Sequence, residues 1–128
     1  MSNILIIEPD RLLAETYALA VLDSGHQAFV APGAQSGIMV ADRIQPDLVI
    51  LELQLVEHSG IEFLYEFRSY PDWQNIPVII HSQVPPHEFN ASIDLLKNEL
   101  GVTVYLYKVQ TKLSQLLQII NEHLTVAA

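Results

Sequence analysis

Four polar residues, each placed at the end of a short apolar run, have the side-chain types that could carry chemistry. They are two carboxylates, a hydroxyl and an ammonium: Glu8, Glu52, Ser82 and Lys108. Two carboxylates can act as an acid and base pair. A hydroxyl and an ammonium can bind an anion. Whether any such chemistry is available depends on the elements that position these four side chains.

The apolar runs alternate with stretches of helical period, which is typical of a parallel sheet covered by helices on both faces. Five strands are predicted, at residues 3–7, 27–31, 48–51, 78–80 and 102–107. The first, third and fourth runs are apolar on both faces, which indicates central strands buried on both sides of the sheet.

Five helices are predicted between and after these strands. Asp10 caps the first, which Gly25 stops, and Pro46 and Pro71 end the second and third. Apolar residues at helical spacing place the second to fifth helices at residues 34–44, 61–67, 88–100 and 113–124. We expect one domain over residues 1–128, a flavodoxin-like doubly wound α/β fold with strand order 2-1-3-4-5. In that order the four polar residues meet at the carboxyl edge of the sheet.

The sequence resembles the receiver domain of bacterial two-component response regulators over essentially its whole length. Four segments carry the resemblance: ILIIEPD from residue 4, PDLVILELQLVEHSGIEFL from residue 46, IPVIIHSQ from residue 76 and VYLYKV from residue 104. The second segment is the most specific, because its Pro-Asp before the strand and its Ser-Gly at the start of the next helix both align with the family pattern.

The resemblance implies a role for each matching position. Glu8 corresponds to the first residue of an acidic pair that holds Mg²⁺, and Glu52 stands where the family has its phosphoacceptor aspartate. Ser82 and Lys108 correspond to the residues that bind the phosphoryl group, and Tyr105 to an aromatic residue that moves in response.

Three departures from the family pattern change what we expect of this pocket. Glu52 is one methylene longer than aspartate, which displaces its carboxylate by about 1.5 Å, and a 1 Å misplacement can cost on the order of 100-fold in a positioned reaction. Pro9 replaces the second acid, so Mg²⁺ is expected to bind weakly or not at all. Val109 replaces the proline after the lysine, where a cis bond would cost roughly 2.5–4 kcal/mol, so we expect a trans bond there.

We therefore interpret the chain as an atypical receiver, or pseudo-receiver, that is not phosphorylated on aspartate and is not an enzyme. Two accounts of the pocket stay open: Glu52 lies against Lys108 and Ser82 and imitates the phosphorylated state, or Glu52 and Lys108 form only a structural ion pair. The alternative is a receiver that is still phosphorylated or regulated by a metal ion. A flavodoxin-like cofactor-binding protein fits less well, because the acidic turn at residues 8–10 would repel a phosphate.

Composition limits the partners. Six Lys and Arg against fifteen Asp and Glu give a net charge of -9, which disfavours nucleic acids and anionic membranes. The chain has no cysteine, and we expect a cytoplasmic protein. The family resemblance implies that it acts by docking to a signalling protein, or as a homodimer, through the face formed by residues 88–100, 102–107 and 113–124. Its histidines are expected at scattered positions on the surface, except that His81 could tune the pocket near neutral pH.

Overall fold

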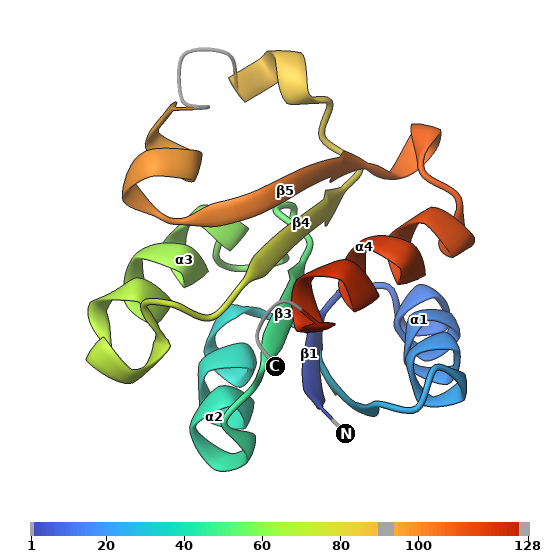
Figure 1. The fold of residues 1–128 in the computed structure, drawn as a ribbon. Helices are drawn as coiled ribbons and strands as arrows, with labels where there is room; N and C mark the ends of the chain where they lie inside the picture. The colour runs from blue at the N-terminus through green and yellow to red at the C-terminus, as the bar shows by residue number, and fades with distance from the viewer. Residues whose placement is uncertain (1, 90–93, 126–128) are drawn as a thin grey trace.

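A computed structural model describes residues 2–89 and 94–125 and contains one five-stranded parallel sheet (Figure 1). The strand order is β2-β1-β3-β4-β5, as predicted. The strands are β1 (Asn3–Ile7), β2 (Gln27–Ala31), β3 (Leu48–Leu51), β4 (Val78–Ser82) and β5 (Val102–Tyr107). Four of them have the predicted bounds, while β4 extends two residues further and so includes His81 and Ser82.

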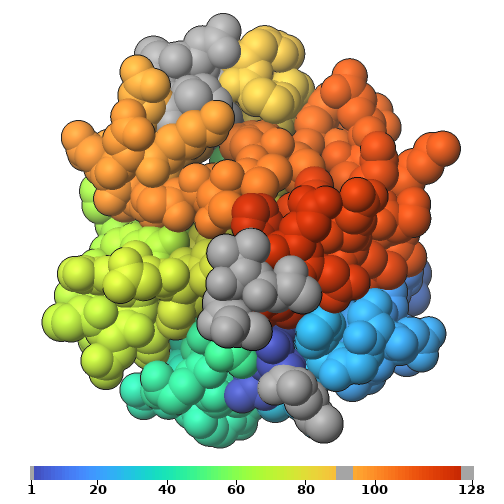
Figure 2. Space-filling view, in the orientation of Figure 1, coloured from blue at the N-terminus to red at the C-terminus, as the bar shows by residue number. Residues whose placement is uncertain are grey.

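Helices cover both faces of the sheet. They are α1 (Arg11–Asp23), α2 (Ala34–Ile44), α3 (Gly60–Ser69) and α4 (Leu113–Thr125). Figures 1 and 2 show α2 beside α3 on one flank of the molecule and α1 beside α4 on the other. Within residues 2–89 and 94–125, no helix combines the length and the apolarity needed to cross a lipid bilayer.

The segment between β4 and β5 differs from the single helix predicted at residues 88–100. Pro86–Phe89 forms a short 3-10 helix, and Leu95–Glu99 forms a π-helical turn, while residues 90–93 lie outside the described part of the chain. Two consecutive prolines cause the early turn, because they fix φ and supply no amide hydrogen. The turn closes with a bond from the Glu88 amide to the Pro85 carbonyl at 3.1 Å.

Two hydrophobic clusters fill the space between the sheet and its helices. One packs the residues of α2 and α3 against one face of the central strands, and Trp73 stacks on Phe67 at its edge, 4.9 Å between ring centroids. The other packs α1 and α4 against the opposite face. Burial on both faces explains why β3 is apolar throughout, β1 after Asn3 and β4 as far as Ile80.

The helices that follow β1 and β3 begin with side-chain caps. Asp10 accepts a hydrogen bond from the Leu13 amide at 3.1 Å, which confirms the predicted cap. Ser59 accepts one from the Glu62 amide at 3.2 Å at the start of α3. Gly60 then lets α3 approach the end of β3, because a Cβ there would lie 2.8 Å from the Glu52 carbonyl oxygen. This close approach fixes the backbone that carries Glu52.

We predict that Gly60→Ala lowers the free energy of unfolding by about 1–3 kcal/mol, because the added methyl group meets backbone atoms that must shift. Gly33→Ala is the matched control: Gly33 also stands at the start of a helix, but its added Cβ would meet nothing closer than 3.9 Å. Urea denaturation of both variants measures the difference. Equal, small effects would show that the approach of α3 to β3 is not tight.

Candidate functional site

The four predicted site residues lie together at the carboxyl edge of the sheet. The side chains of Glu8 and Glu52 are 4% and 3% exposed, and that of Lys108 is 8% exposed. Ser82 is fully buried at the end of β4. The sequence therefore predicted the composition of this cluster, which places charged groups in a pocket largely closed to water.

Lys108 lies between the two carboxylates. Its Nζ donates to Glu8 Oε1 and, at 2.9 Å, to Glu52 Oε1. An ammonium shielded from water needs such acceptors to remain charged. The contact with Glu52 was anticipated in the sequence analysis, whereas the contact with Glu8 was not.

Glu52 accepts hydrogen bonds from four donors. Its Oε2 accepts from the Ser82 hydroxyl and from the Gln54 amide at 3.1 Å. Its Oε1 accepts from Lys108 and from the Gln83 amide at 3.1 Å. The two amides belong to the loops that follow β3 and β4, so the parallel strands themselves aim these donors at one point. We call these four donors the anion cradle.

The cradle sets the ionisation of both charged partners. Burial alone would raise the pKa of Glu52, but the hydrogen bonds from Ser82, Lys108 and the two amides outweigh it and hold the pKa below its usual value. Burial would lower the pKa of Lys108, but its hydrogen bonds to Glu8 and Glu52 outweigh that effect and raise it. Glu52 and Lys108 are therefore both charged at neutral pH.

A chain of hydrogen bonds leads from the cradle to Tyr105. Ser82 Oγ accepts from the Val84 amide at 3.0 Å, and the Val84 carbonyl accepts from the Tyr105 hydroxyl at 2.7 Å. Burial, opposed by a hydrogen bond with Ser82 and reinforced by the charge of Glu52, raises the pKa of Tyr105 to about 12. The phenol thus stays protonated and can donate. We call Ser82, Val84 and Tyr105 the relay.

The carboxylate oxygens that a cation at this pocket would need already have hydrogen-bond partners. Both oxygens of Glu8 are engaged, one with Lys108 and the other with the Asp10 amide at 3.1 Å. Both oxygens of Glu52 are held by the cradle, and Pro9 supplies no side-chain oxygen. Mg²⁺ demands an octahedral set of oxygens and is repelled by the ammonium that occupies this space. Across the described part of the chain, no group of three or more His, Asp or Glu could hold a metal ion.

His81 lies behind the pocket. It is 5% exposed and packs edge to face on Tyr17, with ring centroids 5.1 Å apart. Burial and then the charge of Lys108 lower its pKa to about 4, although the charge of Glu52 opposes this. The expectation that His81 titrates near neutral pH is therefore wrong, because the sequence did not indicate how deeply this side chain is buried.

Comparison with characterised proteins gives both sequence and structural similarities. No protein-family model matches the chain. KdpE of Escherichia coli, the KDP operon transcriptional regulatory protein, is 35% identical over 82 residues, or 64% of this chain and 35% of that protein. A protein-glutamate methylesterase/protein-glutamine glutaminase of Treponema denticola is 28% identical over 128 residues, or 96% of this chain and 32% of that protein. The chain thus spans about a third of the length of these relatives.

The solved structures agree over almost the whole chain. A CheY-like response regulator receiver domain protein from Methanospirillum hungatei superposes with a TM-score of 0.84 at 20% identity, covering 98% of this chain and 94% of that one. TrrA, a response regulator protein of Thermotoga maritima crystallised in complex with Mg²⁺-BeF, gives a TM-score of 0.80 at 16% identity, covering 96% and 99%. The chain has the CheY-like fold.

We predict that the stability of the protein falls as the pH is lowered from about 6.5 to about 4, with a slope that depends on His81. In this window the unfolded chain protonates the imidazole while the folded chain does not, so the unfolded state binds more protons and gains stability. The full difference amounts to about 3 kcal/mol. The measurement is the free energy of unfolding between pH 7 and pH 5, where Glu52 contributes little because its pKa is lowered from 4.5.

His81→Phe keeps a ring against Tyr17 and should remove most of this slope. The exposed His87→Gln serves as the control and should leave it unchanged. A slope that survives in His81→Phe would mean that another group causes it.

Proposed function

We propose that this domain is a cytoplasmic signalling module whose anion cradle is filled by its own Glu52 carboxylate and which does not accept a phosphoryl group. The observation that carries the proposal is the set of four donors to Glu52, namely Ser82, Lys108 and the amides of Gln54 and Gln83. A buried carboxylate with this many donors is held in one position.

The donors to Glu52 support an imitation of the phosphorylated state. The family resemblance assigns the positions of Ser82 and Lys108 to the binding of a phosphoryl group on the residue at position 52. That group would extend beyond an aspartate carboxylate, in the direction in which the additional methylene of Glu52 carries its own oxygens. Here those oxygens meet the same hydroxyl and the same ammonium, and two backbone amides complete the cradle.

The geometry also argues against phosphoryl transfer to Glu52. A nucleophilic oxygen must approach the phosphorus in line, whereas both oxygens of Glu52 already accept two hydrogen bonds each. A phosphodonor would bring further negative charge toward Glu8 and Glu52, with Lys108 as the opposing cation and without the metal ion that usually neutralises such charge. Both obstacles act before any bond can form.

A fixed cradle has a consequence for the surface around Tyr105. Because Ser82 also accepts from the Val84 amide, the relay holds Tyr105 in one position while Glu52 stays in place. We therefore propose a constant binding surface around η3 (Leu95–Glu99), β5 and α4, used by a signalling protein or a second copy of the chain. The competing account is that Glu52 and Lys108 form an ion pair that has no effect on the position of Tyr105. An energetic coupling between Ser82 and Tyr105 distinguishes the two accounts.

Covalent phosphorylation of the chain tests this proposal. Incubated with Mg²⁺ and acetyl phosphate, the natural chain should keep its mass, because Glu52 is misplaced for attack and Pro9 removes a metal ligand. Glu52→Asp should gain one phosphoryl group, or Pro9→Asp with Glu52→Asp should do so if the metal ligand is also needed. Intact-mass spectrometry reads the result. A phosphoryl adduct on the natural chain would refute the proposal and favour an ordinary phosphorylated receiver.

The energetic coupling between the residues of the relay also tests the proposal. Ser82→Ala and Tyr105→Phe should show a coupling of about 0.5 kcal/mol or more in a double-mutant cycle of unfolding free energies, because both remove parts of one hydrogen-bond chain. Thr111→Val, which removes a separate bond to the Tyr107 carbonyl, is the control and should be additive with Ser82→Ala. Additive effects of Ser82→Ala and Tyr105→Phe would leave the structural ion pair as the better account.

A further inference from the structure

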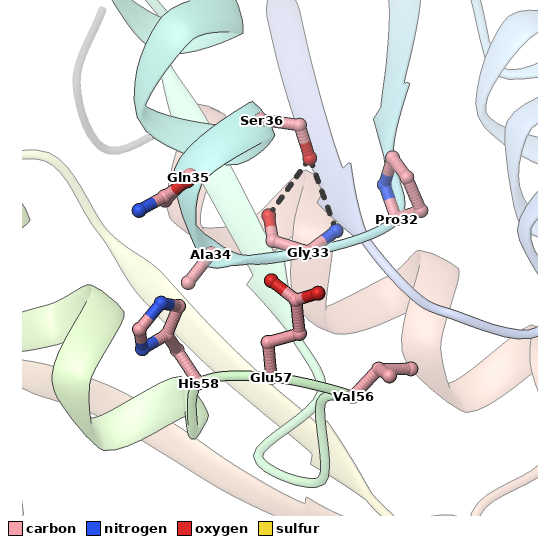
Figure 3. Close-up of a pocket in the computed structure, with 8 residues that line it drawn as sticks. All are labelled: Pro32, Gly33, Ala34, Gln35, Ser36, Val56, Glu57 and His58. Carbon is pink, nitrogen blue, oxygen red and sulfur yellow. Dashed lines mark hydrogen bonds between the residues drawn. The ribbon is translucent and has the colours of Figure 1, made fainter.

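Three hollows that share lining residues lie around the loop between β3 and α3, outside the pocket of Glu52. One of about 300 Å³ lies between this loop and the first turn of α2, and Figure 3 shows its lining. A second, of about 360 Å³, lies on the other side of the loop, toward Val84. A third, of about 190 Å³, lies between α2 and α3. His58 lines all three, and we call them together the loop groove.

The floor of the loop groove is apolar. Aliphatic and aromatic side chains line it: Ala34, Ile38, Leu53, Leu55, Ile61 and Phe63. Val56 stands at the rim and is 85% exposed, more than any other large hydrophobic residue of the described chain. The first and second hollows are therefore suited to apolar side chains, and covering Val56 would remove apolar surface from water.

The walls of the loop groove are acidic. Glu57, Glu62 and Glu66 line the hollows, and no Lys or Arg lines any of the three. Figure 3 shows the Glu57 carboxylate directed toward the backbone of Gly33, so the positive end of α2 offsets its charge. Glu62 contacts His58 at 2.8 Å, and Glu66 follows one turn later on α3. Two carboxylates thus border an apolar floor on one side.

We infer that the loop groove is a docking site for a basic amphipathic segment of a partner protein. Large apolar side chains of that segment fill the hollows beside Val56, and its Lys or Arg side chains face Glu62 and Glu66. Charge complementarity selects this occupant, because both the groove and the whole chain, with a net charge of -9, repel acidic segments.

The second hollow links the loop groove to the relay. Val84 lines it, and the backbone of Val84 carries the bonds to Ser82 and Tyr105. A side chain inserted there would contact Val84, whose carbonyl accepts the hydrogen bond of Tyr105. Docking would therefore change the environment of Tyr105 on β5. This coupling rests on the proposed function, whereas the docking itself does not.

A library of random 12-residue peptides displayed on phage, selected against the full chain, provides the probe. We expect the selected peptides to combine Lys or Arg with Leu, Ile or Phe at helical spacing. For a synthetic copy of the best peptide, Glu62→Gln with Glu66→Gln should weaken binding about fivefold. Glu15→Gln with Asp23→Asn removes the same charge from α1 and should change binding much less.

A second pair of variants tests the apolar rim. Val56→Ser should weaken binding of the peptide several-fold, while Val109→Ser, at a residue 74% exposed in the turn after β5 and outside the three hollows, should not. Peptides that are acidic or neutral, or that bind all variants equally, would overturn the docking site. In NMR spectra, the amides of Val84 and Tyr105 should shift on binding. Binding without such shifts would overturn the coupling alone, and the phosphodonor experiment judges the proposed function separately.

Discussion

A carboxylate remains ionised away from water only when other donors replace its lost solvation, and in this protein the carboxylate of Glu52 obtains four such donors. Two come from the side chains of Ser82 on β4 and of Lys108 directly after β5, and two from backbone amides in the loops that follow β3 and β4. Within this arrangement Ser82 donates to Glu52 and accepts from the Val84 amide, and the Val84 carbonyl accepts from Tyr105. Parallel strands make it possible, because their carboxyl ends bring short loops together at one edge.

The net energy of the ion pairs is not what gives the cluster its importance. Desolvation of two carboxylates and an ammonium can cancel the attraction between them, so an apolar replacement could be equally stable. What the cluster provides is position: Lys108 is tied to Glu8 and Glu52 at once, and Ser82 is tied to both Glu52 and Val84. Removing one member leaves buried polar groups without partners, which is costly. Because changing this geometry costs free energy, it suits a domain that keeps one conformation.

The sequence was sufficient to predict the sheet and the membership of the cluster. Runs such as that of β3, apolar at all four positions, have few alternatives to a buried strand, and the first polar residue after each strand must lie at the carboxyl edge. The amides of Gln54 and Gln83 were not predicted as donors, because nearly every residue type carries a backbone N–H and the sequence does not show where it points. The contact of Lys108 with Glu8 depends on side-chain reach, which spacing does not determine.

Other features needed the three-dimensional structure for similar reasons. The prolines at 85 and 86 lead into a 3-10 helix over Pro86–Phe89, so the chain is not α-helical at residue 88, where the predicted helix begins. His81 lies just beyond the strand predicted at residues 78–80, and its burial involves Tyr17 from α1, which the spacing of residues does not reveal. The loop groove joins α2, α3 and the loop after β3, and the charges of its walls become meaningful only when these segments are adjacent.

A crystal structure of the natural chain at high resolution, grown with Mg²⁺ and beryllium fluoride present, tests the central claim most directly. The account predicts that Ser82 Oγ, Lys108 Nζ and the amides of Gln54 and Gln83 all lie within hydrogen-bond distance of the Glu52 carboxylate, with the Tyr105 hydroxyl on the Val84 carbonyl. A Glu52 side chain turned toward solvent, with Mg²⁺ and the fluoride occupying the four donors in its place, would contradict it.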